Sequence, residues 1–141
     1  MKRFVLFSLF SIIFFGCNVP VNYYVRNLTD EPVEISLIKD DGFSVDMFEF
    51  KYSNKELPIK FDTHKDLNES VKQESDNNEV RLTILPHSTH YLGFGSNFRQ
   101  VFKKAVIYKG SESKTIGLTD TEGLQVSRSF ISKYAVWFDI K

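Results

Sequence analysis

Short runs rich in β-branched and aromatic residues, separated by turn-forming residues, are the feature that most limits what this chain can fold into. In Phe48-Glu49-Phe50-Lys51-Tyr52 the rings and the charges alternate, which places them on opposite faces of a strand. Strands are predicted over residues 21–26, 32–38, 43–52, 57–61, 80–85, 89–95, 99–109, 113–118 and 134–140. Eight or nine short strands with turns between them predict an all-β fold, a single antiparallel β-sandwich over residues 21–141.

Turn chemistry supports this pattern at three joints. Residues 27–31 (NLTDE) separate the first two predicted strands, and Asn, Thr and Asp side chains bond their own backbone in turns. Asp41-Gly42 is a strong hairpin signal, and Gly110-Ser111-Glu112 predicts a second hairpin. Tyr134 to Ile140 is apolar on both faces, which predicts an interior strand.

Residues 62–79 (DTHKDLNESVKQESDNNE) interrupt the strand pattern, because Leu67 and Val71 are the only aliphatic residues among them. Their four-residue spacing after Thr63 permits a short surface helix. The polar composition fits a mobile loop equally well. In either case the sequence predicts a polar insertion outside the core.

The charges exclude one class of partner. The chain carries 18 Lys and Arg against 18 Asp and Glu, and without Lys2 and Arg3 the balance is 16 against 18, a net charge of −2. No basic stripe is visible in the sequence, so no nucleic-acid partner is expected. A polybasic attraction to anionic lipid has no support in the sequence either.

The N-terminus has the pattern of a secretory signal. Lys2 and Arg3 precede an uncharged run from Phe4 to Phe15. A membrane-spanning helix needs ~20 apolar residues, so this run is too short to span but suits the apolar core of a signal peptide. Residues 1–16 are therefore predicted to be a leader that directs export. Cys17, the single cysteine, follows directly, and it excludes a disulfide within the chain.

Phe14-Phe15-Gly16-Cys17 resembles the lipobox of bacterial lipoprotein precursors, with Phe14 where that family usually has leucine. The resemblance implies a diacylglyceryl thioether on Cys17, cleavage after Gly16 and acylation of the new amine. Residues 17–20 would then be the lipidated cysteine and a short tether of about 10–15 Å. Membrane lipid would be bound through the acylated Cys17. Because enterobacterial lipoproteins retained at the inner membrane usually have aspartate after the cysteine, Asn18 favours the outer membrane if the cell is Gram-negative.

Two further stretches carry a weaker resemblance. Residues 24–38 (YVRNLTDEPVEISLI) and 82–92 (LTILPHSTHYL) resemble the strand and Pro-bearing turn patterns of bacterial immunoglobulin-like β-sandwich modules. This resemblance implies a fold class and no activity.

Candidate chemical motifs are incomplete. His87-x-x-His90 follows Pro86, and His64 is the third histidine. Because a zinc site needs three or four ligands, His87 and His90 are expected to be surface turn histidines. Residues 93–97 (GFGSN) lack the third glycine of a dinucleotide fingerprint. No Gly-x-Ser-x-Gly elbow is present. The sequence therefore predicts no catalytic residue, no metal and no cofactor.

Unplaced aromatic residues are the remaining candidates for a binding surface. They are Phe43, Phe48, Tyr91, Phe94, Phe98 and Phe102, and most are expected to belong to the core. An exposed subset would mark a site of contact with a partner.

The resulting hypothesis is a membrane-anchored bacterial lipoprotein of the cell envelope, exported and held by its lipid. Its β-sandwich would act as a non-catalytic binding or structural module for a membrane-proximal protein or envelope component. Two alternatives stay open. One is an inhibitor or immunity-type lipoprotein that blocks an enzyme through a loop such as 86–99, and the other is an envelope hydrolase. The residues that bind the partner are not identified by the sequence.

Overall fold

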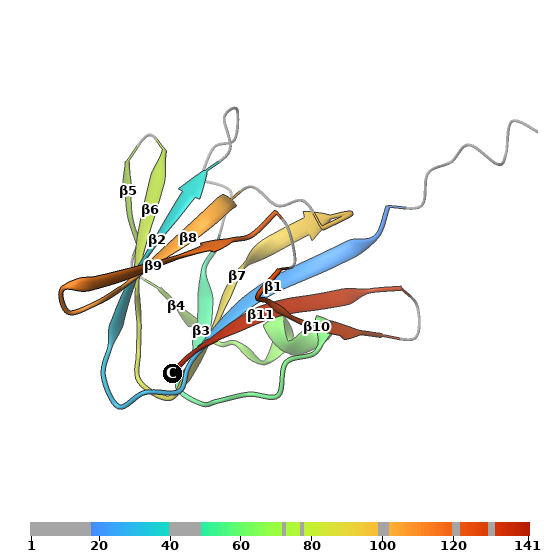
Figure 1. Cartoon of the computed structure of the whole chain (residues 1–141). Helices are drawn as coiled ribbons and strands as arrows, with labels where there is room; N and C mark the ends of the chain where they lie inside the picture. The colour runs from blue at the N-terminus through green and yellow to red at the C-terminus, as the bar shows by residue number, and fades with distance from the viewer. Residues whose placement is uncertain are drawn as a thin grey trace, which may run out of the picture.

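A computed structural model describes residues 18–39, 49–71, 73–76, 78–98, 102–119, 122–129 and 132–141. The predicted leader, Cys17, the Asp41-Gly42 turn, Phe43 and Phe48 lie outside these residues. The described residues form eleven strands and one 3-10 helix in two sheets (Figure 1). The prediction of an all-β sandwich is confirmed at this level.

The six-stranded sheet has the order β10-β11-β1-β7-β3-β4 and the five-stranded sheet the order β5-β6-β2-β8-β9. The strands of the first sheet are β10 (Gln125–Arg128), β11 (Tyr134–Ile140), β1 (Pro20–Asn27), β7 (Ser88–Ser96), β3 (Lys51–Ser53) and β4 (Glu69–Ser70). Those of the second sheet are β5 (Gln73–Asp76), β6 (Glu79–Ile84), β2 (Val33–Lys39), β8 (Phe102–Lys109) and β9 (Glu112–Gly117).

One strand pair corrects the prediction of a wholly antiparallel sandwich. β1 and β11 are parallel, with Val21 opposite Tyr134 and Asn27 opposite Ile140. Parallel neighbours need a long connection, and here the rest of the domain lies between the two strands in sequence. β11 has β10 and β1 as neighbours, so the predicted interior strand is confirmed.

A single apolar core fills the space between the sheets. It combines Val21, Tyr23, Val25, Leu92, Val136, Phe138 and Ile140 of the first sheet with Val33, Ile35, Leu37, Val80, Leu82, Ile84, Phe102, Ala105 and Ile107 of the second. Successive residues of a strand face opposite sides, so alternate positions of β1 and β6 supply this core. At Gly93 the register of β1 and β7 shifts, and its φ of 130° is one that glycine adopts without strain.

The turn between β1 and β2 is built from the predicted residues. The buried Asn27 side chain donates from Nδ2 to the carbonyl of Glu31 at 2.8 Å, and its Oδ1 accepts from the backbone and hydroxyl of Thr29 at 3.0 and 2.7 Å. These bonds satisfy the polar groups of the turn within the protein.

Two sequence predictions are wrong over residues 57–79. Residues 57–61 form no strand, because the Leu57 amide donates to Thr89 Oγ1 and the chain turns into the 3-10 helix η3 (Phe61–Asp66). Residues 62–79 do not lie outside the core. They include part of η3 and the strands β4 and β5. β4 pairs into the six-stranded sheet and β5 into the five-stranded sheet, and the segment buries Thr63 and Leu67.

The segment from Leu57 to Leu67 covers the outer face of the six-stranded sheet. Ile59 and Leu67 form a second apolar cluster with Tyr24 and Ala135, and Leu57, Tyr91 and Trp137 pack against it. This sheet is therefore covered on its inner face and, around Tyr24 and Ala135, on its outer face.

Candidate functional site

The three histidines occupy separate environments. His87 is exposed in the turn before β7, His90 lies inside β7 with 1% exposure, and His64 is in η3. The prediction that His87 and His90 are both surface turn residues is wrong for His90. His90 is opposite Val25 of β1, whose side chain belongs to the core between the sheets, so its ring lies on the same inner face. Among the described residues no cluster of three or more His, Cys, Asp or Glu could hold a metal.

His87 joins three separate segments. Its Nε2 lies 2.8 Å from Asp30 Oδ1 and its Nδ1 lies 2.5 Å from Glu56 Oε1. The hydrogen bond to Asp30, followed by that to Glu56, raises the pKa of His87 above its ordinary value. Because both ring nitrogens are already bonded to carboxylates, the residue acts as a bridge at this surface.

His90 is a neutral, buried imidazole. Ser88 Oγ donates to the carbonyl of Leu85, so its oxygen accepts from His90 Nε2 at 2.9 Å. Nδ1 therefore carries the lone pair, and it is buried without a partner in the part of the chain that the structure describes. Burial lowers the pKa of His90 to about 4. The ring stacks on Tyr52, with centroids 5.0 Å apart.

The Ser88–His90 pair is the nearest approach to a catalytic dyad in this part of the molecule. For nucleophilic catalysis, histidine must accept the serine proton. Here the serine proton is directed to Leu85 and histidine is the donor, and Ser88 is fully buried. In this geometry the pair forms structural hydrogen bonds.

A hollow of about 330 Å³ lies beside His90 at the edge of the sandwich. Its lining residues are Tyr52, Ser70, Val71, Thr83, Leu85 and His90. None of these side chains carries a charge at neutral pH, because the pKa of His90 is lowered. The hollow is at the small end of the range for ligand pockets and suits a small uncharged group.

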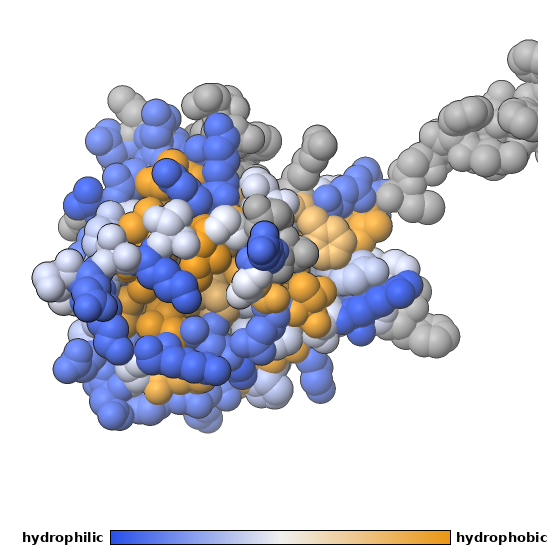
Figure 2. All heavy atoms as spheres, viewed as in Figure 1, coloured by the Kyte–Doolittle hydropathy of each residue, from blue (hydrophilic) through white to orange (hydrophobic). Residues whose placement is uncertain are grey.

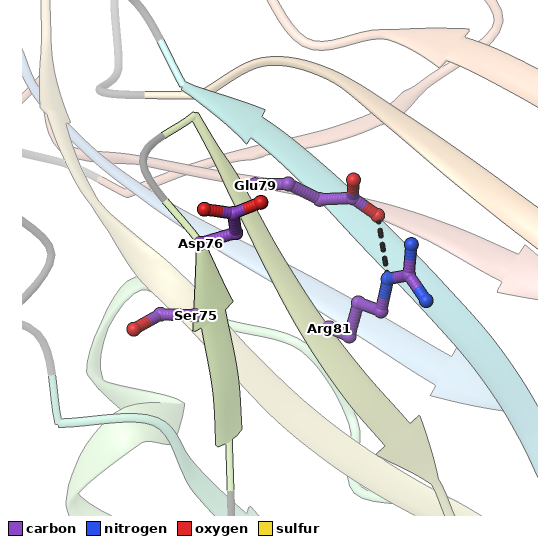
Figure 3. Close-up of a pocket in the computed structure, with 4 residues that line it drawn as sticks. All are labelled: Ser75, Asp76, Glu79 and Arg81. Carbon is purple, nitrogen blue, oxygen red and sulfur yellow. Dashed lines mark hydrogen bonds and ion pairs between the residues drawn. The ribbon is translucent and has the colours of Figure 1, made fainter.

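A second hollow, of about 240 Å³, lies at the β5–β6 hairpin and is lined by Ser75, Asp76, Glu79 and Arg81 (Figure 3). Arg81 Nε donates to Glu79 Oε1 at 2.8 Å, and Ser36 Oγ donates to the same oxygen. The bond from Ser36, followed by that from Arg81, lowers the pKa of Glu79. Its carboxylate is therefore already engaged, and the site is an exposed ion pair on a sheet face.

A polar network on the outer face of the six-stranded sheet was not predicted. Tyr24 Oη and Asn22 Nδ2 both donate to the carbonyl of Phe61, at 2.8 and 2.7 Å, and Tyr91 Oη donates to Asn22 Oδ1 at 3.1 Å. Burial raises the pKa of Tyr91 to about 12. The hydroxyls are thus protonated and bonded, and they hold η3 on the sheet.

The aromatic candidates divide between core and surface. Phe102 is fully buried, Tyr91 packs against the second cluster, and Phe98 packs partly against the main core. Phe94 is 51% exposed, on the outer face of β7 opposite Asn22. It is one of three large apolar side chains that the described residues leave exposed, with Tyr108 and Val126.

The chain just before β1 is fixed to the end of β7. Val19 and Asn97 exchange two bonds, from Val19 N to Asn97 Oδ1 at 2.9 Å and from Asn97 N to Val19 O at 2.8 Å. Asn97 and Phe98 both have positive φ, 52° and 60°, which is rare for a bulky residue such as Phe98. The predicted tether of residues 17–20 is therefore corrected, because Val19 already belongs to the fold.

No family model, curated protein or solved structure matches this chain in the comparisons with known proteins. Within the described residues, no helix has the length and apolar composition needed to cross a membrane. Cys17 lies outside those residues, so its lipidation stays a prediction.

Proposed function

We propose that the chain is a lipid-anchored lipoprotein of the bacterial envelope whose β-sandwich holds a partner close to the membrane. The supporting observation is the position of β1, which starts at Pro20, three residues after Cys17. A lipid on that cysteine would place the whole domain against the bilayer surface. The leader before Cys17 supplies the route to export.

The binding role has support in the hollow beside His90, which offers an uncharged recess at the edge of the sandwich. The proposed partner is a membrane-proximal protein or envelope component, and the proposed location is the outer membrane if the cell is Gram-negative. The inhibitor alternative loses its suggested loop, because Ser88–Ser96 of residues 86–99 is a strand inside the six-stranded sheet. The hydrolase alternative has no specific observation in its favour.

Labelling with a palmitate analogue tests the anchor. The full chain is expressed in a bacterial host beside Cys17→Ala, and incorporation of the label and membrane fractionation are measured. We expect label and membrane association with the wild type only. Equal labelling of the two chains, or none, would show that the anchor is wrong.

Crosslinking in cells tests the binding role separately. Partners captured by the wild type are identified by mass spectrometry, with Cys17→Ala as the control for membrane location. A defined partner captured by the anchored chain supports the proposal. Capture of nothing specific by a lipidated chain would contradict the binding role while leaving the anchor in place.

A further inference from the structure

One end of the six-stranded sheet gathers the residues nearest to Cys17, and we call it the anchor end. It comprises the described residues 18–22, 93–98, 126–129 and 132–135. The register places these segments side by side, with Val21 opposite Gly95 and Tyr134, and Arg128 opposite Tyr134. Figure 1 shows the start of β1, the end of β7 and the β10–β11 connection at the same end of the molecule.

The Val19–Asn97 bonds make the anchor end stiff. A left-handed conformation at Asn97 and Phe98 costs free energy that surrounding contacts must compensate. The Asn97 bonds to Val19 do this, and Phe98 packs edge-on against Tyr134 with centroids 4.9 Å apart. Only Asn18 separates Val19 from Cys17, so a lipid there would lie within ~7 Å of this turn.

The charge of the anchor end differs from that of the opposite end. Its described residues include two cations, Arg128 and Lys133, and no carboxylate. Arg128 is exposed and its guanidinium lies 5.8 Å from the Tyr134 ring centroid. At the other end of the same sheet, beside the ends of β1 and β11, charges of both signs lie side by side, as in the Arg26–Asp139 pair.

The anchor end also carries exposed apolar surface. Phe94 is 51% exposed, and Figure 2 shows hydrophobic atoms at the surface around the start of β1. Aromatic rings beside basic side chains are the combination favoured at the boundary between headgroups and hydrocarbon.

We infer that the anchor end lies on the lipid surface and fixes the orientation of the domain, with Phe94 in the headgroup region and Arg128 toward lipid phosphates, while the Lys133 ammonium packs over the Phe61 ring. The occupant of this surface is the membrane itself. The opposite end and its His87 bridge then face away from the bilayer. This inference rests on the proposed lipid at Cys17 and adds the face of the domain that meets the membrane.

Fluorescence quenching in vesicles tests the orientation. Lipidation blocks the thiol of Cys17, the single cysteine, so an added cysteine becomes the only one that reacts with a maleimide dye. Phe94→Cys is compared with Tyr108→Cys, which is 40% exposed on β8 opposite Glu34, beyond the far end of β1. Each full chain is purified from bacterial membranes, labelled with an NBD dye and placed in phosphatidylethanolamine–phosphatidylglycerol vesicles containing a nitroxide lipid.

We expect a blue-shifted emission and strong quenching of the dye at position 94, and neither at position 108. Arg128→Glu should reduce the quenching at position 94, and Lys109→Glu, a matched change near Tyr108, should not. Equal thermal midpoints show that the labelled chains are folded. Equal quenching at the two positions in a lipidated chain would overturn the orientation alone.

The mass of the N-terminal peptide separates this failure from that of the proposed function. A peptide with the added mass of a diacylglyceryl group supports the anchor. An unmodified Cys17 would overturn the proposed function and the orientation with it.

Discussion

The inner face of the six-stranded sheet and the part of its outer face around Tyr24 are both covered, but by different means. On the inner face, Val21, Tyr23 and Val25 of β1 pack against apolar side chains of the second sheet. On the outer face, Asn22 and Tyr24 are equally buried, yet the chain that covers them is a segment with little regular structure.

Different interactions hold these two layers. The inner layer gains its stability mainly from apolar burial, which is roughly proportional to area. The outer layer depends on bonds from Asn22 and Tyr24 to the Phe61 carbonyl and on Arg26, which pairs with Asp139 and donates to the Leu57 carbonyl at 3.3 Å. Every residue has a backbone carbonyl, so a layer that is held by hydrogen bonds to a carbonyl leaves no hydrophobic pattern in the sequence. We therefore expect the inner layer to be more rigid, and truncations in it to lower the free energy of unfolding by more than truncations in the outer layer.

The largest effect is expected from a matched pair of leucine truncations. Leu37, fully buried between the sheets, and Leu67, 3% exposed in the outer cluster, are each replaced by alanine. We expect Leu37→Ala to lower the free energy of unfolding by about 4 kcal/mol and Leu67→Ala by about 2 kcal/mol, because the irregular outer segment can collapse into the cavity. Urea denaturation measures both. Equal losses would show that the two layers are equally rigid.

The next effect concerns a polar group on the inner face. Burial lowers the folded-state pKa of His90 to about 4, while in the unfolded chain it is about 6.5. Between these values the unfolded chain binds more protons, so stability falls as the pH falls from 6.5 to 4. The expected loss by pH 4 is about 3 kcal/mol.

Denaturation curves at several pH values, for the wild type and His90→Gln, check this. The glutamine amide can donate to Ser88 and does not titrate, so the variant should be less stable at pH 7 but lose less on acidification. NMR titration should show His90 neutral at pH 5. A wild type and variant with the same pH dependence would contradict a buried neutral imidazole.

The contrast between the two faces also explains what the sequence could predict. The β-branched and aromatic residues of 21–26 and the alternation along 80–85 predicted the strands that carry the inner core. The parallel pairing of β1 with β11 joins segments more than a hundred residues apart, and no local pattern encodes it. His90 was taken for a turn residue, although its spacing of two from Leu92 was a signal of the inner face.

The outer layer was missed for a related reason. Residues 62–79 are polar because most of their side chains face solvent, and Thr63 and Leu67 are the buried exceptions. Their four-residue spacing was visible in the sequence, but their contacts with the sheet were not. The pair of hydrogen bonds between Val19 and Asn97 is likewise a long-range contact, and neither residue belongs to a recognisable motif. The lipidation of Cys17 stays a prediction from the leader.

The smallest of the expected effects tests whether charge holds the outer face. Arg26 donates from Nε and from one terminal nitrogen to the two oxygens of Asp139, at 2.8 and 2.9 Å, and the Asp139 side chain is 7% exposed. Asp139→Asn removes the charge and turns one donor of the new amide toward the guanidinium. We expect a loss of about 2 kcal/mol, within the range for hydrogen bonds to charged groups. Asp62→Asn, at the exposed pair with Lys65, is the control, with a change of less than about 0.5 kcal/mol.

The acid dependence of the same pair gives a second readout. Burial raises the pKa of Asp139, but the hydrogen bonds from Arg26 and Gln125 outweigh burial and leave the pKa lowered. Its contribution is therefore complete above the unfolded-state pKa of about 4 and is lost as the pH falls through the lower folded-state value. The difference in stability between wild type and Asp139→Asn should shrink over that range in chemical denaturation. A difference that stays constant, or an Asp139→Asn loss no larger than that of Asp62→Asn, would mean that apolar contacts of Tyr24 and Leu67 hold the outer layer and the ion pair does not.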